Sequence, residues 1–337
     1  MLEKSVFDNK TIKSVVKDKY NIDVISIRKI KIGSANLYSI NDDEYILKEF
    51  QSKYKEEDII KEIKVINHLK KDSIPVPEYV KTKDKKYYFI YNDRVVIMQR
   101  FIKGNTLKLN TGTREQILES AEYLGKIVLS LKTLRHKLPN RNISSWYDVD
   151  SSVLKKEKLS YKVKGKYKEK IIDDLNEKMY FLNYLKDKIN IKEMIKKITY
   201  MKTHGDYNVL QFIYKDNKII AIIDFATSCK MPIIWEIIRS YSYIDSKCKN
   251  GDINIDNLIL YVKEFTKYIK LNKYDLKYMP YFYLIQLLCS DYGYKQYIED
   301  ESKINLLKFG IYRTKISKKL LDKAHIISER LLKEIEC

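Results

Sequence analysis

The stretch HGDYNVLQFIYKDNKIIAIIDFA, residues 204–226, contains carboxylates on both sides of a β-hairpin pattern. Asp216 and Asn217 lie between two runs rich in β-branched and aromatic residues, which is typical of a tight hairpin turn. Counting outward from this turn brings Gln211 and Asp224 close together at the open end of the hairpin. Asp206 lies five residues before Gln211, on the loop that enters the same end. We therefore expect two carboxylates and one amide to converge.

Phosphoryl transfer uses such a set of side chains. One carboxylate orients or deprotonates the attacking hydroxyl, and a second carboxylate with a neutral oxygen ligand holds the magnesium ions that bridge the phosphates. Asp224 directly follows the apolar run 219–223, so it is expected at the mouth of a buried strand. Aspartate is also a preferred turn residue, and taken alone this position favours an ordinary turn over a metal ligand.

The first hundred residues contain a second indication. Lys48 lies within a predicted strand, 45–50, and Glu62 lies on the apolar face of a predicted helix, 54–71. A glutamate on an apolar face is costly unless it is paired, and Lys48 is its natural partner. A strand lysine held by a helix glutamate positions ATP phosphates in kinases. The alternative is that Glu62 reaches water from the edge of the face and that Lys48 points outward.

The order of elements predicts the fold class. Strands are expected at 24–30, 44–50, 87–91 and 94–98, with a turn at 33–36. After Gly104 the spacing is mainly helical, interrupted by a hairpin at 209–225, and we interpret the lysine-rich residues 155–170 as a solvated loop or helix connection. The sequence therefore predicts an α+β protein with a small β-rich N-terminal lobe, 1–103, and a larger helical C-terminal lobe, 104–337.

Lys48, Glu62, HGDYNVLQ at 204–211 and IIDFA at 222–226 occur in the order and spacing of a known family. Over nearly its whole length the chain resembles the aminoglycoside phosphotransferase and choline kinase family. The resemblance implies a protein-kinase-like two-lobe fold. It also implies an ATP- or GTP-dependent enzyme that phosphorylates a hydroxyl of a small-molecule alcohol, with Mg²⁺ as cofactor.

The resemblance assigns roles to the acidic residues and to Gln211. Asp206 would be the catalytic base, and Asp224 with Gln211 would hold magnesium. The family usually has asparagine where this chain has Gln211, whose longer arm changes the geometry. Asn208 is an alternative ligand if the loop is rearranged.

The resemblance also assigns the ligand contacts. The Lys48 side chain, held by Glu62, would contact the phosphates of the nucleotide. The Gly33-Ser34 turn would cover the phosphates, and backbone groups of Gln99 and Phe101 would contact the adenine. The acceptor would bind near Tyr243, Asp291 and Tyr292. A cationic aminoglycoside would need a strongly acidic pocket there. The net charge of +20 argues against one, although Asp291 and residues 299–301 could supply local acidity.

The composition leaves two other classes of protein open. The chain has 65 Lys+Arg against 45 Asp+Glu, but these residues are spread along it without a nucleic-acid-binding motif. We therefore expect no nucleic-acid partner, with salt-sensitive binding to a polyanion as the alternative. A catalytically inactive kinase-like binding or structural protein, such as a spore-coat-associated relative, is the second alternative. Scattered cysteines and the lack of a long apolar run indicate a cytoplasmic protein without membrane segments, and the oligomeric state is unknown.

Overall fold

The computed structural model describes residues 3–30 and 35–336. The chain divides into two compact units, each assembled from separate stretches of sequence. The sheet unit comprises Met1–Thr106, Thr133–Leu138 and Gln211–Ser228. The helical unit comprises Leu107–Lys132, Pro139–Leu210 and Cys229–Cys337. The architecture confirms the expected α+β class, with a small β-rich part and a larger helical part.

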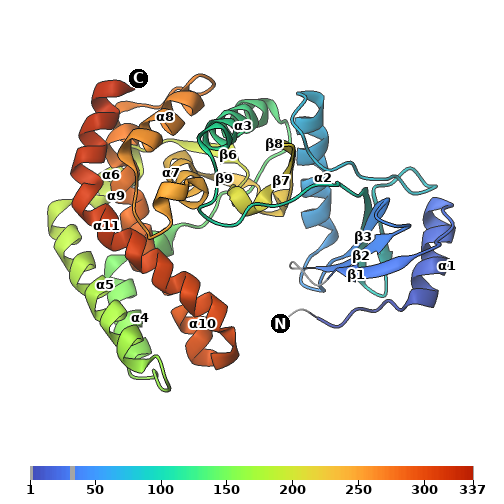
Figure 1. Cartoon of the computed structure of the whole chain (residues 1–337), viewed down its shortest axis with the longest axis horizontal. Coiled ribbons are helices and arrows are strands. Elements are labelled where there is room, and N and C mark those ends of the chain that lie inside the picture. The colour runs from blue at the N-terminus through green and yellow to red at the C-terminus, as the bar shows by residue number, and fades with distance from the viewer. Residues whose placement is uncertain (1–2, 31–34, 337) are drawn as a thin grey trace. The chain divides into compact units, whose positions relative to one another are not determined.

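A five-stranded antiparallel sheet forms the centre of the sheet unit, in the order β1-β2-β3-β5-β4. Its strands are β1 (Ile27–Ile30), β2 (Asn36–Ile40), β3 (Tyr45–Glu49), β4 (Tyr88–Tyr91) and β5 (Arg94–Arg100). Helix α1 (Asn9–Tyr20) lies beside the sheet in Figure 1 and packs Ile12 and Val16 into its core. Helix α2 (Glu56–Lys71) has Ile59, Ile66 and Leu69 buried, which confirms the amphipathic pattern read from the sequence.

Strand β2 is the main difference from the expected sheet. The sequence placed a turn at 33–36 between two strands, and residues 33 and 34 lie outside the described residues. The structure adds a strand at Asn36–Ile40, and the chain then turns through Asn41, Asp42 and Asp43, all with positive φ. Asn and Asp tolerate this left-handed conformation, so the Asn-Asp-Asp triplet is the turn signal.

The hairpin that follows the Asp206 loop belongs to the sheet unit. Strands β7 (Phe212–Lys215) and β8 (Lys218–Ile222) pair through a turn at Asp216 and Asn217, with φ values of 50° and 61°. Two positive φ values in a two-residue loop match the right-handed twist of paired strands. The amide of Ile222 donates to the carbonyl of Pro75 at 2.8 Å, which fixes the hairpin to the sheet unit. The observed units therefore differ from the expected lobes 1–103 and 104–337 in where they place this hairpin.

The helical unit is built around α9 (Lys273–Cys289), most of whose side chains are buried. The long helix α11 (Ile304–Glu334) packs against α9, and α4 and α5 run beside each other in Figure 1. The other helices are α3 (Arg114–Thr133), α4 (Val149–Ser160), α5 (Lys168–Lys188), α6 (Ile191–Lys197), α7 (Ile233–Ile244), α8 (Ile255–Thr266) and α10 (Tyr294–Glu299). Strands β6 (Tyr200–Thr203) and β9 (Cys229–Pro232) form a second short ladder that the sequence did not predict.

Part of the lysine-rich segment lies inside the helical unit. Helix α4 continues to Ser160, so the segment is not simply a solvated connection. Lys156 is 1% exposed and donates to the carbonyl of Cys289 at 2.8 Å. Lys178 of α5 is also buried and donates to the carbonyls of Leu287 and Ser290. These buried ammonium groups satisfy carbonyls at the C-terminal end of α9, where a positive charge is favourable.

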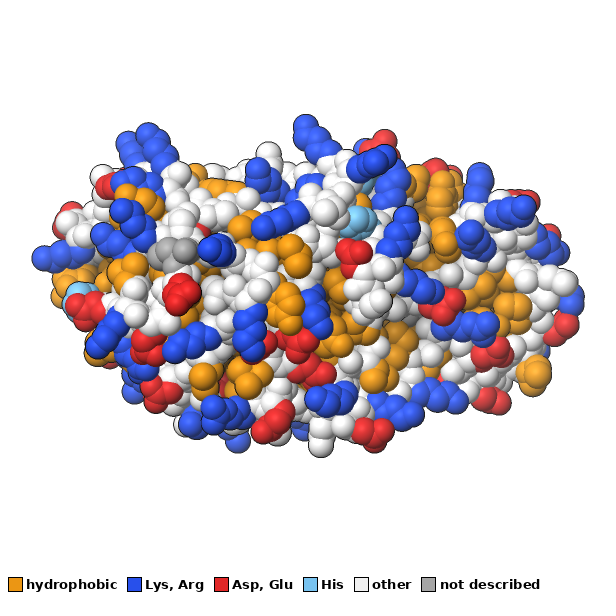
Figure 2. Space-filling view, turned by 90° about the horizontal axis from the view of Figure 1, so that it is seen from above, with side chains coloured by type: hydrophobic (Ala, Val, Ile, Leu, Met, Phe, Trp, Pro, Cys, Tyr) orange, Lys and Arg blue, Asp and Glu red, His pale blue; other side chains and the backbone are white. Residues whose placement is uncertain are grey.

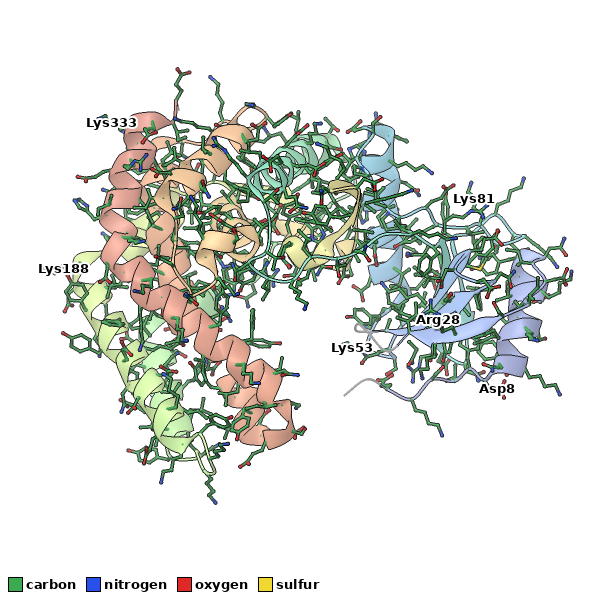
Figure 3. The ribbon with its side chains drawn as sticks, viewed as in Figure 1. Asp8, Arg28, Lys53, Lys81, Lys188 and Lys333 are labelled. Carbon is green, nitrogen blue, oxygen red and sulfur yellow. The ribbon has the colours of Figure 1, made fainter. Side chains whose placement is uncertain are left out.

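Charged side chains of both signs are spread over the surface. Figure 2 shows blue and red side chains interspersed over the visible face. In Figure 3, Lys188 and Lys333 lie at the outer edge of the helical unit. Among the described residues, no helix combines the length and apolar character needed to cross a membrane.

Candidate active site

The loop that carries Asp206 follows β6 in the helical unit. Strand β6 pairs with β9, and α7 begins directly after β9, so the loop and the start of α7 lie together. Glu236 of α7 is fully buried and accepts hydrogen bonds from the Tyr207 amide at 2.9 Å and from the Thr203 hydroxyl. A buried carboxylate is stable only when its oxygens are satisfied in this way. Glu236 therefore fixes the backbone on both sides of His204-Gly205-Asp206.

An ion pair holds the Asp206 side chain. Nη2 of Arg239, one turn of α7 beyond Glu236, donates to Oδ1 of Asp206 at 2.6 Å. The guanidinium carbon lies 4.9 Å from the ring centres of both Trp235 and Tyr243, so aromatic rings fix its position. Burial disfavours the charged guanidinium, but Asp206 and neighbouring groups outweigh it and hold the pKa of Arg239 above its usual value. The Asp206 side chain is 38% exposed and reachable by a small molecule.

Asn208 supports the same loop rather than standing free as a ligand. Its side-chain nitrogen donates to the carbonyl of Asp206 at 2.7 Å, and its Oδ1 accepts from the amide of Leu210 at 3.0 Å. Asn208 is 2% exposed. Its amide is thus used within the loop, and this arrangement does not favour the alternative in which Asn208 binds the metal.

Asp224 and Gln211 meet at the open end of the hairpin in the sheet unit. The Ile223 amide donates to the Gln211 carbonyl at 2.9 Å, next to the Phe212–Ile222 pair of the ladder. This confirms the proximity predicted by counting outward from the turn. Asp224 has φ 66° and ψ 57°, and its side chain forms no capping hydrogen bond to the short helix η3 (Phe225–Thr227) that follows. The left-handed conformation turns the chain directly after the buried strand.

The structure gives Glu62 a different partner from the one expected. Oε1 of Glu62 accepts a hydrogen bond from the hydroxyl of Tyr79 at 3.0 Å, and Oε2 has no hydrogen-bond partner among the described residues. The ammonium of Lys48 lies 4.5 Å from the ring centre of Phe50, and no ion pair joins it to Glu62 within the described residues. Burial, followed by the charges of Glu62 and Asp224, raises the pKa of Tyr79. Tyr79 therefore donates to the Glu62 carboxylate and also feels the charge of Asp224.

The expected adenine contacts lie on and after β5. Gln99 pairs with Ile46 of β3 on one side and with Tyr79 on the other. The Phe101 amide donates to the carbonyl of Glu44 at 2.9 Å, so this N–H is already used within the sheet unit. The predicted Gly33-Ser34 phosphate turn lies outside the described residues.

The three predicted acceptor residues all belong to the helical unit. Tyr243 and Tyr292 both contact the ring of Phe309, at 5.9 and 6.2 Å between ring centres. Tyr243 is buried and stacks on Arg239, whereas Tyr292 is 42% exposed. The Asp291 carboxylate acts on the pKa of Lys156, which burial lowers to about 8 and the charge of Asp291 partly restores. Tyr243 and Tyr292 thus pack against the same ring, that of Phe309, and Tyr243 also packs against Arg239.

The donor types at Asp224 and Gln211 suit a magnesium ion. Mg²⁺ binds oxygen ligands, keeps several waters and takes phosphate oxygens, so one or two protein side chains are enough. Among the described residues, no group of three or more His, Cys, Asp or Glu side chains forms a complete metal cage. A carboxylate and an amide oxygen at the end of the hairpin therefore fit a metal that a nucleotide also coordinates.

Sequence reasoning missed three residues that position this site: Glu236, Arg239 and Tyr79. A signal for the first two was present, since a glutamate and an arginine in the otherwise apolar run of α7 must be paired to be buried. Tyr79 carried no such signal, because a tyrosine between prolines and a hairpin fits many environments.

Comparisons with known proteins identify the family. A model of the phosphotransferase enzyme family matches residues 26–249. The chain belongs to this family. Homoserine kinase of Zymomonas mobilis subsp. mobilis is 25% identical over 222 residues, an alignment that spans 65% of this chain and 65% of that protein. This membership confirms the resemblance read from the Lys48, Glu62, Asp206 and Asp224 motifs.

Solved structures of other phosphotransferases share the fold. Spectinomycin phosphotransferase in complex with ADP and spectinomycin has a TM-score of 0.64 at 15% identity, covering 98% of this chain and 100% of that chain. Amicoumacin kinase in complex with AMP-PNP and Ca²⁺ has a TM-score of 0.64 at 14% identity, covering 93% and 94%. A microcompartment-associated aminopropanol kinase has a TM-score of 0.61 at 13% identity, covering 94% and 99%. At these identities the likeness shows the kinase-like fold.

Proposed function

We propose that the protein is a kinase that transfers a phosphoryl group from ATP or GTP, bound with Mg²⁺, to a hydroxyl group of a small molecule. The observation that carries this proposal is the Asp206 loop, which is fixed by Glu236 while the Asp206 carboxylate stays reachable. Membership of the phosphotransferase enzyme family supports it. Relatives named as kinases of homoserine, spectinomycin and aminopropanol support a small-molecule acceptor.

Each residue has a role in the proposed reaction. Asp206 accepts the proton of the acceptor hydroxyl, and Arg239 keeps the carboxylate oriented. Asp224 and Gln211 supply the oxygen ligands for magnesium, and the Lys48 ammonium binds phosphate oxygens. Magnesium, when bound, neutralises charge on the phosphates. Glu62, with one carboxylate oxygen unpartnered among the described residues, is available to hold Lys48.

A thermal-unfolding titration with ATP and with GTP, with and without magnesium, tests the nucleotide site. The wild type should gain about 2.7 kcal/mol of stability at a ligand concentration of about 100 Kd. Asp224→Asn should lose the magnesium-dependent part of this gain. Asp216→Asn is the matched control, because Asp216 lies in the exposed turn of the same hairpin and asparagine tolerates its positive φ.

Nucleoside diphosphate release then tests catalysis with a panel of alcohols. Asp206→Asn should keep the magnesium-dependent stabilisation and lower turnover by about 10²- to 10⁴-fold, the usual contribution of a general base. If neither nucleotide stabilises the wild type at millimolar concentration, the kinase proposal fails. Nucleotide binding without any turnover would instead support the alternative of an inactive kinase-like binding protein.

A further inference from the structure

Two arginines hold the loop that carries Asp206, and both lie around the indole of Trp235. Arg239 contacts the Asp206 carboxylate, as described above. Nη1 of Arg141 donates to the carbonyl of Gly205 at 2.6 Å. Their guanidinium carbons lie 4.9 and 5.8 Å from the Trp235 ring centre. All these residues belong to the helical unit, so two cations and the proposed base share one rigid neighbourhood.

Two of the three charged side chains here that are not fully buried are arginines, Arg141 and Arg239, and the third is Asp206. Arg239 neutralises Asp206, and Arg141 forms no ion pair with a carboxylate in the part of the chain that the structure describes. Glu236 of α7 is the other acidic group that contacts the loop, but it is 0% exposed and its two oxygens accept hydrogen bonds from Tyr207 and Thr203. A molecule that approaches Asp206 therefore meets two guanidinium groups and one carboxylate that is already paired.

The two guanidinium groups retain hydrogen-bonding capacity. An arginine has five N–H donors in a planar fork that matches a carboxylate. Within the described residues, Arg239 uses Nη1 and Nη2 on Tyr207 and Asp206, and Arg141 uses Nη1 on Gly205. Both guanidinium groups lie against aromatic rings, so less side-chain entropy remains to be lost when a ligand binds.

We infer that the acceptor is a small hydroxy acid whose carboxylate binds the Arg141–Arg239 pair while its hydroxyl lies at Asp206. This inference rests on the proposed kinase function and names its substrate class. A cationic amino alcohol at the same place would be repelled by both guanidinium groups and would find its carboxylate partner already neutralised.

The proposed step balances without a further reactant. The acceptor hydroxyl oxygen forms a bond to the γ-phosphorus as the bond from that phosphorus to the β–γ bridging oxygen breaks. The hydroxyl proton passes to Asp206, and the nucleoside diphosphate leaves with the electron pair of the broken bond. The products are the phosphorylated hydroxy acid and the nucleoside diphosphate.

The test compares acceptors of similar size and opposite charge. Glycolate is paired with ethanolamine, and γ-hydroxybutyrate is paired with aminobutanol. Release of nucleoside diphosphate by the full-length protein is followed with each acceptor. A hydroxy acid should stimulate release above the basal rate with water, and the matched amine should not. Two results would overturn the substrate class. In the first, an amine stimulates release and its matched hydroxy acid does not; in the second, none of the hydroxy acids tested stimulates release.

Variants separate carboxylate binding from mere positioning of Asp206. Arg141→Gln and Arg239→Gln should each raise the KM for the hydroxy acid by at least about tenfold, the effect of one charge-assisted hydrogen bond. Arg239→Lys should keep part of the affinity, and Arg114→Gln, at an exposed position on α3, is the control. Equal loss of kcat with an unchanged KM in both arginine variants would show a purely structural role and refute the inference. Magnesium-dependent stabilisation by nucleotide is measured on every variant, so that failure of the kinase function is recognised separately.

Discussion

The hydrogen bond from Tyr79 to Glu62 gives a sharp prediction for Tyr79→Phe. Glu62 is 2% exposed, Oε1 accepts from Tyr79 at 3.0 Å, and Oε2 has no partner among the described residues. A hydrogen bond to a charged group contributes about 1.5–3 kcal/mol, and a buried carboxylate left unsatisfied is at the upper end of that range. We therefore expect Tyr79→Phe to lower the free energy of unfolding by about 2–3 kcal/mol.

Urea denaturation of a double-mutant cycle isolates this interaction. The four proteins are wild type, Tyr79→Phe, Glu62→Gln and the double variant, and the expected coupling free energy is about 1.5–3 kcal/mol. Tyr87→Phe is the control, since Tyr87 lies in the same unit and stacks on Lys81 instead of donating to a buried carboxylate. Its stability should change by less than about 0.5 kcal/mol.

A coupling free energy below about 0.5 kcal/mol would refute the reasoning, because Glu62 would then be satisfied by another group. The same cycle repeated with nucleotide and magnesium adds a functional readout. If Lys48 reaches Glu62 when phosphates bind, as proposed, the coupling between Tyr79 and Glu62 should fall. An unchanged coupling in the presence of saturating nucleotide would contradict the proposed contact between Lys48 and Glu62.

Four further substitutions test other parts of the structure. Burial lowers the pKa of Lys156 from 10.5 to about 8, so the unfolded chain binds more protons between pH 8 and pH 10.5, and wild-type stability should rise with pH over this window. The midpoint of urea denaturation should therefore rise less with pH in Lys156→Met than in the wild type. Equal dependence of the midpoint on pH in the two proteins would contradict the burial argument. Gly293→Ala should lower stability by more than about 2 kcal/mol, because φ is +95° and a Cβ would lie 2.4 Å from the Leu306 carbonyl oxygen. Gly165→Ala is the comparison: its new Cβ meets only a flexible glutamate side chain, so it should lower stability by about 1 kcal/mol. Thermal unfolding of the two glycine variants measures both changes. Glu236→Gln should keep magnesium-dependent nucleotide stabilisation but lower turnover about a hundredfold as the Asp206 loop loosens, and unchanged turnover would argue against its positioning role.

Local sequence patterns predicted the parts of the fold that depend on neighbouring residues. The hairpin register could be read from the Asp216-Asn217 turn, and the amphipathic helix from the spacing of Ile59, Ile63, Ile66 and Leu69. Strand β2 was missed because the polar residues Asn36 and Ser39 interrupt its apolar pattern and because Asn36 was assigned to the preceding turn. The ladder of β6 and β9 was missed because each strand has four residues and its partner lies far along the chain.

The chemical roles of the candidate site stay predictions, and the structure tests some of the expected contacts. The acidic residues Asp206 and Asp224 could be proposed from spacing, and the placement of Asp224 beside Gln211 was correct. The Lys48–Glu62 pair was expected from the cost of burying a carboxylate, but the structure satisfies part of that cost with Tyr79. A sequence pattern indicates that a buried charge needs a partner, and the tertiary structure determines which residue is that partner.

The hairpin of residues 212–222 has a consequence for how the protein is made. The sheet unit needs this hairpin, which binds the backbone of Pro75 and Asn105, although more than a hundred residues separate the hairpin from either. A ribosome that has finished the five-stranded sheet must still translate α3 to β6 before that unit is complete. We expect nascent chains halted before residue 228 to be cleaved readily by protease in the first hundred residues, and chains halted after it to resist. The first part of the polypeptide to be synthesised thus reaches its final stability only when the middle of the chain has emerged.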